Sequence, residues 1–264
     1  MSVNLADPSA FVGGAQHEQL AELRRTAPVY FQEMSGQPGF YAVLKHADLV
    51  HVARHSEVFS ASEGGVVLEN LAPEQLEMMR HMLLAMDPPA HSQFRAPLSE
   101  HFKAKVIARL EDDIRAITQA IMKEAAEQRD VEFVHDVTSK LPSRVVGQLM
   151  GLPEEDWPTI HQLAERCTSG QDPDVAGSPD ELANASIEMA MYAIEFAGRR
   201  RAEEPHADLT SVILESDFGG APMSDIDFGS FFVQLVTAGN DTTKTMLSSG
   251  LLALLQHPEQ LAEL

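Results

Sequence analysis

The chain has 264 residues, of which 44% are hydrophobic, and it carries a formal net charge of −21. It is long enough to bury a sizeable core, as one large domain or as two smaller ones. The acidic balance argues against nucleic acid as a partner, and the basic run 199–201 falls at the end of an expected helix, where cations complement the helix dipole.

The N-terminal sequence and the cysteine count indicate the cellular compartment of the protein. The N-terminus has neither a basic start nor an apolar segment, so we expect no signal peptide and no membrane anchor. Cys167 is the single cysteine, which leaves no internal disulfide and no cysteine-based zinc site. Both features are typical of a cytoplasmic protein.

The first 60 residues carry the one convincing sheet signal. Residues 16–26 predict a short helix, and the apolar runs 28–31 and 40–44 flank a Gly/Pro turn, which predicts a β-hairpin. Residues 46–54 predict a second helix, where His51 and His55 have a spacing that would suit a metal. No third ligand lies nearby in the sequence, so a metal site is the less favoured interpretation.

A helix start is specified around residue 87. Asp87 is a natural N-cap and Pro88 a natural first helical residue. His91 and Arg95 would then lie on one face of the first turns, where two donors near the positive end of the helix dipole suit a carboxylate. Taken alone, the stretch is more often only an exposed polar face.

Helix dominates the middle of the chain. Apolar positions from Val106 to Ile121 predict one amphipathic helix, and those from Val137 to Leu149 predict a second, closed by Gly151. Residues 131–134 are interpreted as a short strand between them. Further helices are expected over 154–168 and 180–202, with a turn-rich connection over 168–179.

The longest predicted helix covers about residues 225–256. Ser224, with Asp227 three residues later, supplies a capping-box-like start, and Pro258 supplies the stop. At 1.5 Å per residue this helix would be roughly 45–50 Å long. Its flanks are strongly apolar, so we expect the rest of the fold to pack around it.

The centre of this helix is unusual because residues 237 and 239–243 are poor helix formers. Ala238 and Gly239 remove side-chain bulk, so a flat or large group could lie there. Thr242 could hydrogen-bond the carbonyl four residues earlier, which tends to bend or open a helix. Asp241 beside this hydroxyl indicates proton delivery. The alternative is a close helix crossing, with the polar residues facing solvent.

Two stretches of the sequence resemble the cytochrome P-450 monooxygenase family. Ala238–Thr243 reads Ala-Gly-Asn-Asp-Thr-Thr and is similar to the central-helix signature of the family. Asp87–Arg95 is similar to its Asp-Pro-Pro-x-His-x-x-x-Arg motif, with Ser92 in place of the commoner threonine. The motifs occur in the family's order, about 150 residues apart.

The resemblance implies a mainly α fold with a small β-hairpin region, binding haem b. By that resemblance His91 and Arg95 hold the haem propionates, and Ala238 and Gly239 leave space for O2. Asp241 would relay protons, and Thr242 would hydrogen-bond oxygen bound at the iron. The helices over 154–168 and 180–202 would form a lid over the substrate.

The family's iron ligand is a cysteine that this chain lacks. The residues around Cys167 do not resemble the family's cysteine loop, so no metal ligand is expected in this chain, and the thiolate is expected beyond Leu264. We therefore expect one P-450 domain over 1–264, with a helix and hairpin region over 1–60 and a helical region over 61–264, truncated after the central helix. Such a fragment would be inactive alone.

The expected reaction is hydroxylation of a lipophilic small molecule such as a sterol, terpenoid or fatty acid. The resemblance to soluble bacterial members implies electrons from NAD(P)H, delivered through ferredoxin and its reductase. Two alternatives stay open: a different helical enzyme with Asp241 as general base, and a nonenzymatic helical module for ligand binding or interaction.

Overall fold

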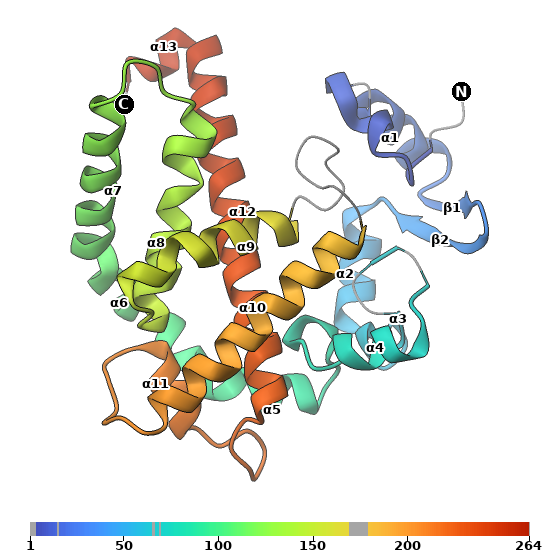
Figure 1. Cartoon of the computed structure of the whole chain (residues 1–264). Coiled ribbons are helices and arrows are strands. Elements are labelled where there is room, and N and C mark those ends of the chain that lie inside the picture. Colours follow the sequence, from blue (N-terminus) through green and yellow to red (C-terminus); the bar gives the residue numbers. More distant parts are fainter. Residues whose placement is uncertain (1–3, 15, 65–66, 69, 169–178, 264) are drawn as a thin grey trace. The chain divides into compact units, whose positions relative to one another are not determined.

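A computed structural model describes residues 4–14, 16–64, 67–68, 70–168 and 179–263 (Figure 1). The chain divides into two compact units, Met1–Ser92 and Gln93–Leu264. The single-domain organisation expected from the sequence stays a prediction. Within the described ranges, no helix combines the length and the apolar character needed to cross a bilayer.

The first unit contains the predicted hairpin and several short helices. Its elements are α1 (Gln16–Thr26), β1 (Val29–Met34), β2 (Gln37–Val43), α2 (His46–Arg54), α3 (Ala61–Gly64) and α4 (Pro73–Met79), with 3-10 turns at Pro8–Gly14 and Leu83–Ala85. The strands pair antiparallel, with Val29 opposite Val43. Gly39 has a φ of 82°, and a Cβ there would collide with the Gln32 carbonyl oxygen, so the hairpin needs glycine at this position.

The histidine pair of α2 forms a packed ring pair. The His51 and His55 ring centroids lie 4.2 Å apart, and His55 Nδ1 is 2.7 Å from the His51 carbonyl oxygen. That ring nitrogen is therefore occupied by a backbone hydrogen bond. Over the residues that the structure describes, no group of three or more potential metal ligands occurs.

The second unit is helical. After α5 (Ala90–Ser99), which crosses the boundary between the units, its helices are α6 (Ala104–Ile107), α7 (Glu111–Ala126), α8 (Lys140–Met150), α9 (Trp157–Thr168), α10 (Pro179–Arg200), α11 (Leu209–Glu215), α12 (Asp225–Gln256) and α13 (Pro258–Leu261), with 3-10 turns at Glu100–Phe102, Ala108–Leu110 and Glu154–Asp156. The predicted central helix is confirmed as α12.

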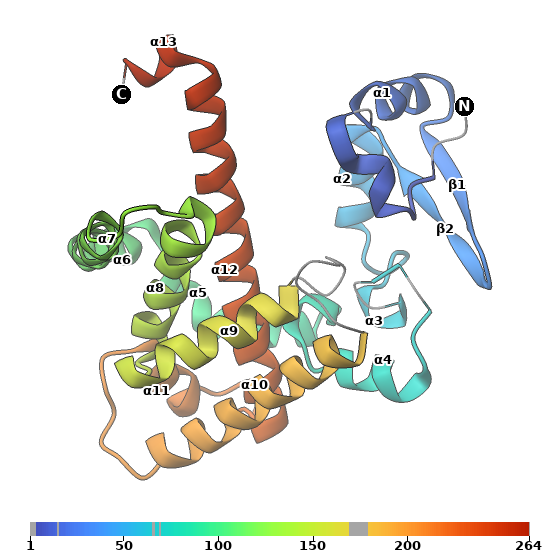
Figure 2. The same ribbon diagram turned by 45° about the horizontal axis from the view of Figure 1, so that its top comes forward.

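The core of this unit surrounds the first half of α12. Figures 1 and 2 show α9 and α10 crossing this half, with α8 beside them. Phe228 and Phe232 are fully buried, as is Met189 of α10. A Cβ at Gly229 would lie 3.2 Å from the Ala190 carbonyl oxygen, so the missing side chain lets α10 cross closely. Large apolar side chains and one glycine thus fix this crossing.

The predicted strand over 131–134 is wrong. Phe133 is helical and leads into a π-helical turn, Val134–Thr138. The Glu132 carboxylate accepts the His135 N–H at 2.5 Å, and the Asp136 carboxylate accepts the Glu132 N–H at 2.9 Å. These side chains satisfy the free N–H groups of a helix start, which a strand would not have.

The bounds of the other helices differ only slightly from those predicted from the sequence. The expected helix over 106–121 is divided into α6, a 3-10 turn and α7, and the expected helix over 137–149 starts with the π-helical turn before α8. Gly151 closes α8 with a left-handed φ of 68°, as predicted. The turn-rich connection after α9 lies mainly outside the described residues.

The basic run at the end of α10 is structural, as expected. Arg200 is buried, and its guanidinium lies 2.8 Å from the Asp208 carboxylate. Asp208 is also the N-cap of α11 and accepts the Ser211 N–H. This ion pair therefore joins α10 to α11.

Candidate functional site

The candidate site is the centre of α12. The helix starts as predicted, because the Ser224 hydroxyl accepts the Asp227 N–H at 3.1 Å, and it runs without interruption to Gln256. Its buried first half changes at residue 237 into the polar segment 237–243. The four predicted site residues of this helix, Asp241, Thr242, Ala238 and Gly239, thus lie within two turns.

Thr242 forms the hydrogen bond expected of it. Its hydroxyl donates to the Ala238 carbonyl oxygen at 2.8 Å, and the Thr237 hydroxyl makes the equivalent bond to Val233 at 2.7 Å. The helix nevertheless remains α-helical through the segment, so the local opening expected from these residues is not found. A helix carbonyl has two lone pairs and can accept a hydroxyl beside its own helix bond.

The residues of the segment face two different ways. Ala238 and Thr242 are exposed. Gly239 is directed at α8, where a Cβ on it would lie 3.0 Å from Val146 Cγ2. The close helix crossing predicted as the alternative therefore accounts for Gly239. Ala238 and Thr242 do not face α8, and their exposed side chains could contact another group.

Asp241 has a partner that the sequence interpretation missed. Lys244 Nζ lies 3.2 Å from the Asp241 carboxylate, with the lysine side chain only 16% exposed. The spacing of an acid and a base three residues apart was the available signal. The Asp241 side chain itself is 48% exposed, so the pair lies at the edge of the apolar part of the helix.

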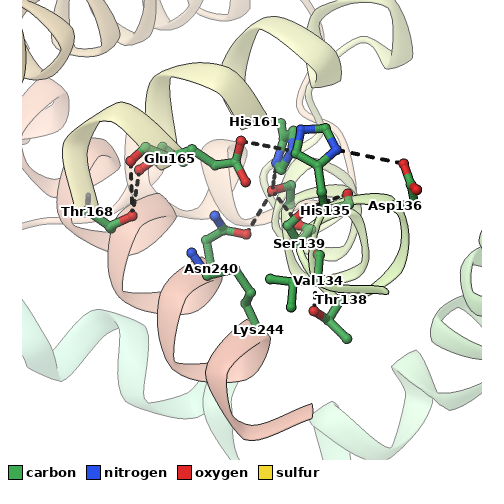
Figure 3. A network of polar contacts seen from close by, with 12 residues as sticks. Val134, His135, Asp136, Thr138, Ser139, His161, Glu165, Thr168, Asn240 and Lys244 are labelled. Atoms are coloured by element: carbon green, nitrogen blue, oxygen red, sulfur yellow. Dashed lines mark hydrogen bonds and ion pairs between the residues drawn. The ribbon is translucent and has the colours of Figure 1, made fainter. Parts of the chain in front are cut away.

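Asn240 is the most buried polar residue of the segment. It is fully buried, and the Ser143 hydroxyl of α8 donates to its Oδ1 at 2.8 Å. The same hydroxyl oxygen lies 2.9 Å from His161 Nδ1 on α9, and His161 Nε2 lies 3.5 Å from the Glu165 carboxylate (Figure 3). Sequence reasoning missed these contacts, because they join α12 to the successive helices α8 and α9, which lie far from it in the chain.

The predicted clamp residues lie together on α5. His91 is half-buried and Arg95 is exposed, one turn further along the helix. Neither side chain forms a hydrogen bond or an ion pair with another described residue. Both can therefore donate to an added carboxylate.

The predicted role of Asp87 as the N-cap of this helix is wrong. Helix α5 starts at Ala90, after a cis peptide bond between Pro88 and Pro89. The Asp87 carboxylate instead accepts the Ala61 N–H at 3.0 Å at the start of α3. Hydroxyls of Ser60 and Ser62 donate to the same carboxylate, which lowers the pKa of Asp87 to about 2. These donors precede Asp87 by some 25 residues, so local sequence rules did not identify them.

Cys167 has the character of a packed thiol. It is half-buried on α9, with Sγ 3.4 Å from the Ser186 hydroxyl. Burial raises the pKa of this thiol. A thiol with a raised pKa is a poor source of the thiolate that binds iron.

The sequence of the chain is similar to those of several known proteins. A steroid C26-monooxygenase of Mycolicibacterium smegmatis is 34% identical over 252 residues, covering 92% of this chain and 58% of that protein. A methyl-branched lipid omega-hydroxylase of Mycobacterium tuberculosis is 32% identical over 249 residues, covering 91% of this chain and 58% of the relative. No family model matches the chain.

A solved structure gives the same fold. A cytochrome P-450 of Mycobacterium marinum, in complex with pseudoionone, superposes with a TM-score of 0.86 at 33% identity, covering 96% of this chain and 63% of that one. The mainly helical architecture with its small hairpin is thus the cytochrome P-450 fold. The chain belongs to the cytochrome P-450 family, and it spans about 60% of the length of these relatives.

Proposed function

We propose that the chain is part of a haem-thiolate monooxygenase that hydroxylates a lipophilic substrate. The observation that carries the proposal is the central segment of α12, where an exposed hydroxyl and a lysine-paired carboxylate interrupt an apolar helix. Bound haem would supply reductive activation of O2, with electrons from NAD(P)H through a ferredoxin and its reductase. Cys167, the single cysteine of the sequence, is not the proposed thiolate ligand.

The described side chains fit such a cofactor. The side chains of His91 and Arg95 form no hydrogen bond or ion pair with other described residues, and they would donate to the two propionate carboxylates. Ala238 presents only a methyl group on an exposed part of α12, so a flat macrocycle could lie close to it. Gly239 lets α12 pack closely against Val146 of α8, and this packing indirectly supports the placement of Ala238 beside the macrocycle.

Asp241 and Thr242 are the proposed catalytic residues. Thr242 can rotate its hydroxyl away from the Ala238 carbonyl to donate toward the reacting oxygen, because that carbonyl keeps its helix bond. Asp241 would hold the proton that resupplies this hydroxyl, with Lys244 setting its orientation. Both residues act by positioning and proton transfer.

The substrate class follows the relatives. Their names specify a steroid C26-monooxygenase and a methyl-branched lipid omega-hydroxylase, which share attack near the end of an aliphatic chain. We propose that the substrate here also carries such a chain, as sterols, terpenoids and fatty acids do. A steroid with an aliphatic side chain should be converted, and the same ring system without the chain should not.

Replacement of Thr242 by Ala tests the catalytic assignment in the monooxygenase that contains these residues. We expect electron consumption to continue while the product formed per electron falls, because the hydroxyl that passes on the proton is lost; one positioned acid–base group typically contributes about 10²–10⁴-fold to the rate. The quantities to measure are NAD(P)H oxidised and hydroxylated product formed. Thr237→Ala is the matched control, because it removes a helix-bonded hydroxyl from the same polar segment at a residue with no proposed catalytic role. Equal coupling in both variants would remove Thr242 from the mechanism.

Replacement of both His91 and Arg95 by Ala tests the cofactor assignment. We expect weaker haem binding in an absorbance titration, by about 1.5–3 kcal/mol for each lost charged hydrogen bond. Arg109→Ala, which removes an exposed cation outside the proposed site, is the control. Unchanged haem affinity in the double variant would instead favour the helical binding or interaction module.

A further inference from the structure

A line of polar side chains leads from the surface of the second unit to the centre of α12. It starts at Glu165 and His161 on α9, passes through Ser143 on α8 and ends at Asn240 on α12 (Figure 3). The outer part lies at a pocket of about 350 Å³, whose lining includes Ser143 and His161. The inner end is fully buried.

The Ser143 hydroxyl has one proton and several acceptors. Its oxygen lies 2.8 Å from Asn240 Oδ1, 2.9 Å from His161 Nδ1 and 3.2 Å from the Ser139 carbonyl oxygen. If the proton goes to Asn240, His161 must donate its Nδ1–H to the serine oxygen. If the proton goes to His161, the serine oxygen is free to accept from Asn240.

The charge on His161 selects between these two directions. A protonated imidazole donates from both nitrogens, to Ser143 and toward Glu165, so Ser143 donates to Asn240. A neutral imidazole that keeps its Nε2–H toward Glu165 must accept at Nδ1. Ser143 then points at His161, and the Asn240 amide must turn over to donate its Nδ2–H to the serine oxygen.

The burial of Asn240 makes this turn energetically important. With Oδ1 toward Ser143, the Nδ2 atom is buried without a hydrogen-bond partner in the described structure. Turning the amide gives that N–H a partner and leaves the oxygen unpaired, and a buried unpaired N–H is the rarer and more costly of the two. Each orientation therefore leaves one buried amide atom of Asn240 unpaired, and the direction of the His161–Ser143 hydrogen bond decides which atom it is.

Burial and several charged groups act on the pKa of His161. Burial lowers the pKa of His161 most, the Glu165 carboxylate on the same helix opposes this, and three cations lower it further. Those cations are His135 of the π-helical turn, Lys140 of α8 and Lys244 of α12. Glu124, Arg144 and Glu154 complete the charged lining of the pocket.

We propose that His161 is a positioning residue whose protonation sets the direction of the His161–Ser143–Asn240 hydrogen bonds and so the orientation of the buried amide beside Asp241. Its consequence for catalysis rests on the proposed function: the amide turns within the segment that holds Asp241 and Thr242, so proton supply there depends on the state of His161. The hydrogen-bond reversal itself requires no cofactor.

The reversal is tested by NMR on the 264-residue chain without haem. The imidazole signals of His161 and the side-chain amide signals of Asn240 are followed as a function of pH. We expect the two residues to titrate with one shared midpoint. In Ser143→Ala, His161 should still titrate while the Asn240 signals lose that step. An Asn240 signal that stays constant, or that follows His161 equally in Ser143→Ala, would overturn the proposal.

A surface substitution gives a second test that leaves the buried residues intact. Glu165→Gln removes the carboxylate that favours imidazolium, so both midpoints should move together to lower pH. Glu188→Gln is the matched control, since Glu188 of α10 is an exposed carboxylate paired with Arg166 of α9, and the substitution should move neither midpoint. Midpoints that separate in Glu165→Gln would contradict a shared hydrogen-bond chain.

The catalytic consequence is measured separately in the monooxygenase. Product formed per electron is determined against pH for the unchanged protein and for Glu165→Gln. We expect a pH-dependent step that shifts to lower pH with the NMR midpoint. If the NMR linkage holds but this step does not shift, the link to the reaction is wrong and the hydrogen-bond chain stands. Absence of any haem-dependent product would instead refute the proposed function.

Discussion

The Asp87 carboxylate stabilises the beginning of α3, although it lies far from that helix in the sequence. It accepts the Ala61 N–H and two serine hydroxyls, and these bonds hold the pKa of Asp87 at about 2, below its usual value of 3.8. Because the folded pKa is the lower one, the carboxylate stabilises the fold fully above about pH 4 and loses this effect as the pH falls toward 2.

Asp87→Asn should therefore destabilise the chain by about 1 kcal/mol at pH 7, the usual size of a lost helix cap. Denaturant unfolding at several pH values measures the difference from the unchanged protein. The two proteins should converge as the pH falls through 2, because the Asp87 carboxyl then becomes neutral, as the asparagine is. Asp48→Asn, which removes a carboxylate from the first turn of α2, is the control. A difference that persists unchanged to low pH would contradict the assignment.

At the scale of elements, replacing either of two helix glycines by alanine should change the stability of the fold in opposite directions. A Cβ at Gly147 of α8 would lie 2.7 Å from Trp157 Nε1 of α9, whereas a Cβ at Gly198 of α10 would meet nothing within 4 Å. Gly147→Ala should destabilise by about 1–3 kcal/mol through overpacking. Gly198→Ala should stabilise by up to about 1 kcal/mol through helix propensity. Equal signs for the two changes, in thermal or denaturant unfolding, would refute the close approach of α8 and α9.

The ion pair between α10 and α11 gives a second element-scale prediction. The Arg200 side chain is 5% exposed and pairs with Asp208, whose side chain is 9% exposed. Arg200→Ala should cost about 3–5 kcal/mol, because Asp208 would keep a buried charge without its partner. Arg199→Ala is the control: its pair with Glu195 is exposed, and its loss should cost less than about 1 kcal/mol. If the two variants lost a similar free energy of unfolding in urea, burial of the Arg200–Asp208 pair would not be what stabilises it.

Elements set by local sequence were predicted well. The bounds of α12, the hairpin and the left-handed Gly151 depend on caps, turns and periodicity within a few residues. The failures depend on distant or competing partners. Asp87 binds the start of α3, and Phe133, in a run typical of a strand, is helical and packs against the cluster of Ile121, Ala125 and Val137.

The candidate site was predicted in part for the same reason. Thr242 and its bond to Ala238 follow from helix geometry alone, and the structure confirms that bond. Asn240 was recognised only as a poor helix former. Its contacts with Ser143 and His161 require the packing of three helices, which residue spacing within α12 does not encode.

At the scale of the whole molecule, the net charge of −21 predicts a stability that depends on salt. Repulsion among surface carboxylates opposes the compact state. Raising NaCl from about 10 mM to about 150 mM shortens the screening length from roughly 30 Å to roughly 8 Å. We expect the midpoint of thermal unfolding to rise by about 2–4 °C, the equivalent of roughly 1 kcal/mol. The rise should shrink as the pH is lowered and carboxylates become neutral; an unchanged or lower midpoint would contradict the expectation.

The contact between Gly147 and Trp157 has an optical consequence. Trp157 is the single tryptophan of the chain, and its Nε1 donates to the Leu152 carbonyl oxygen at 3.2 Å. It lines the same pocket as His161, which lies one turn after it on α9. The indole fluorescence of the protein therefore arises entirely from the junction of α8 and α9. Since an imidazolium quenches indole emission more strongly than a neutral imidazole, the light emitted by the unmodified protein should report the proton on His161.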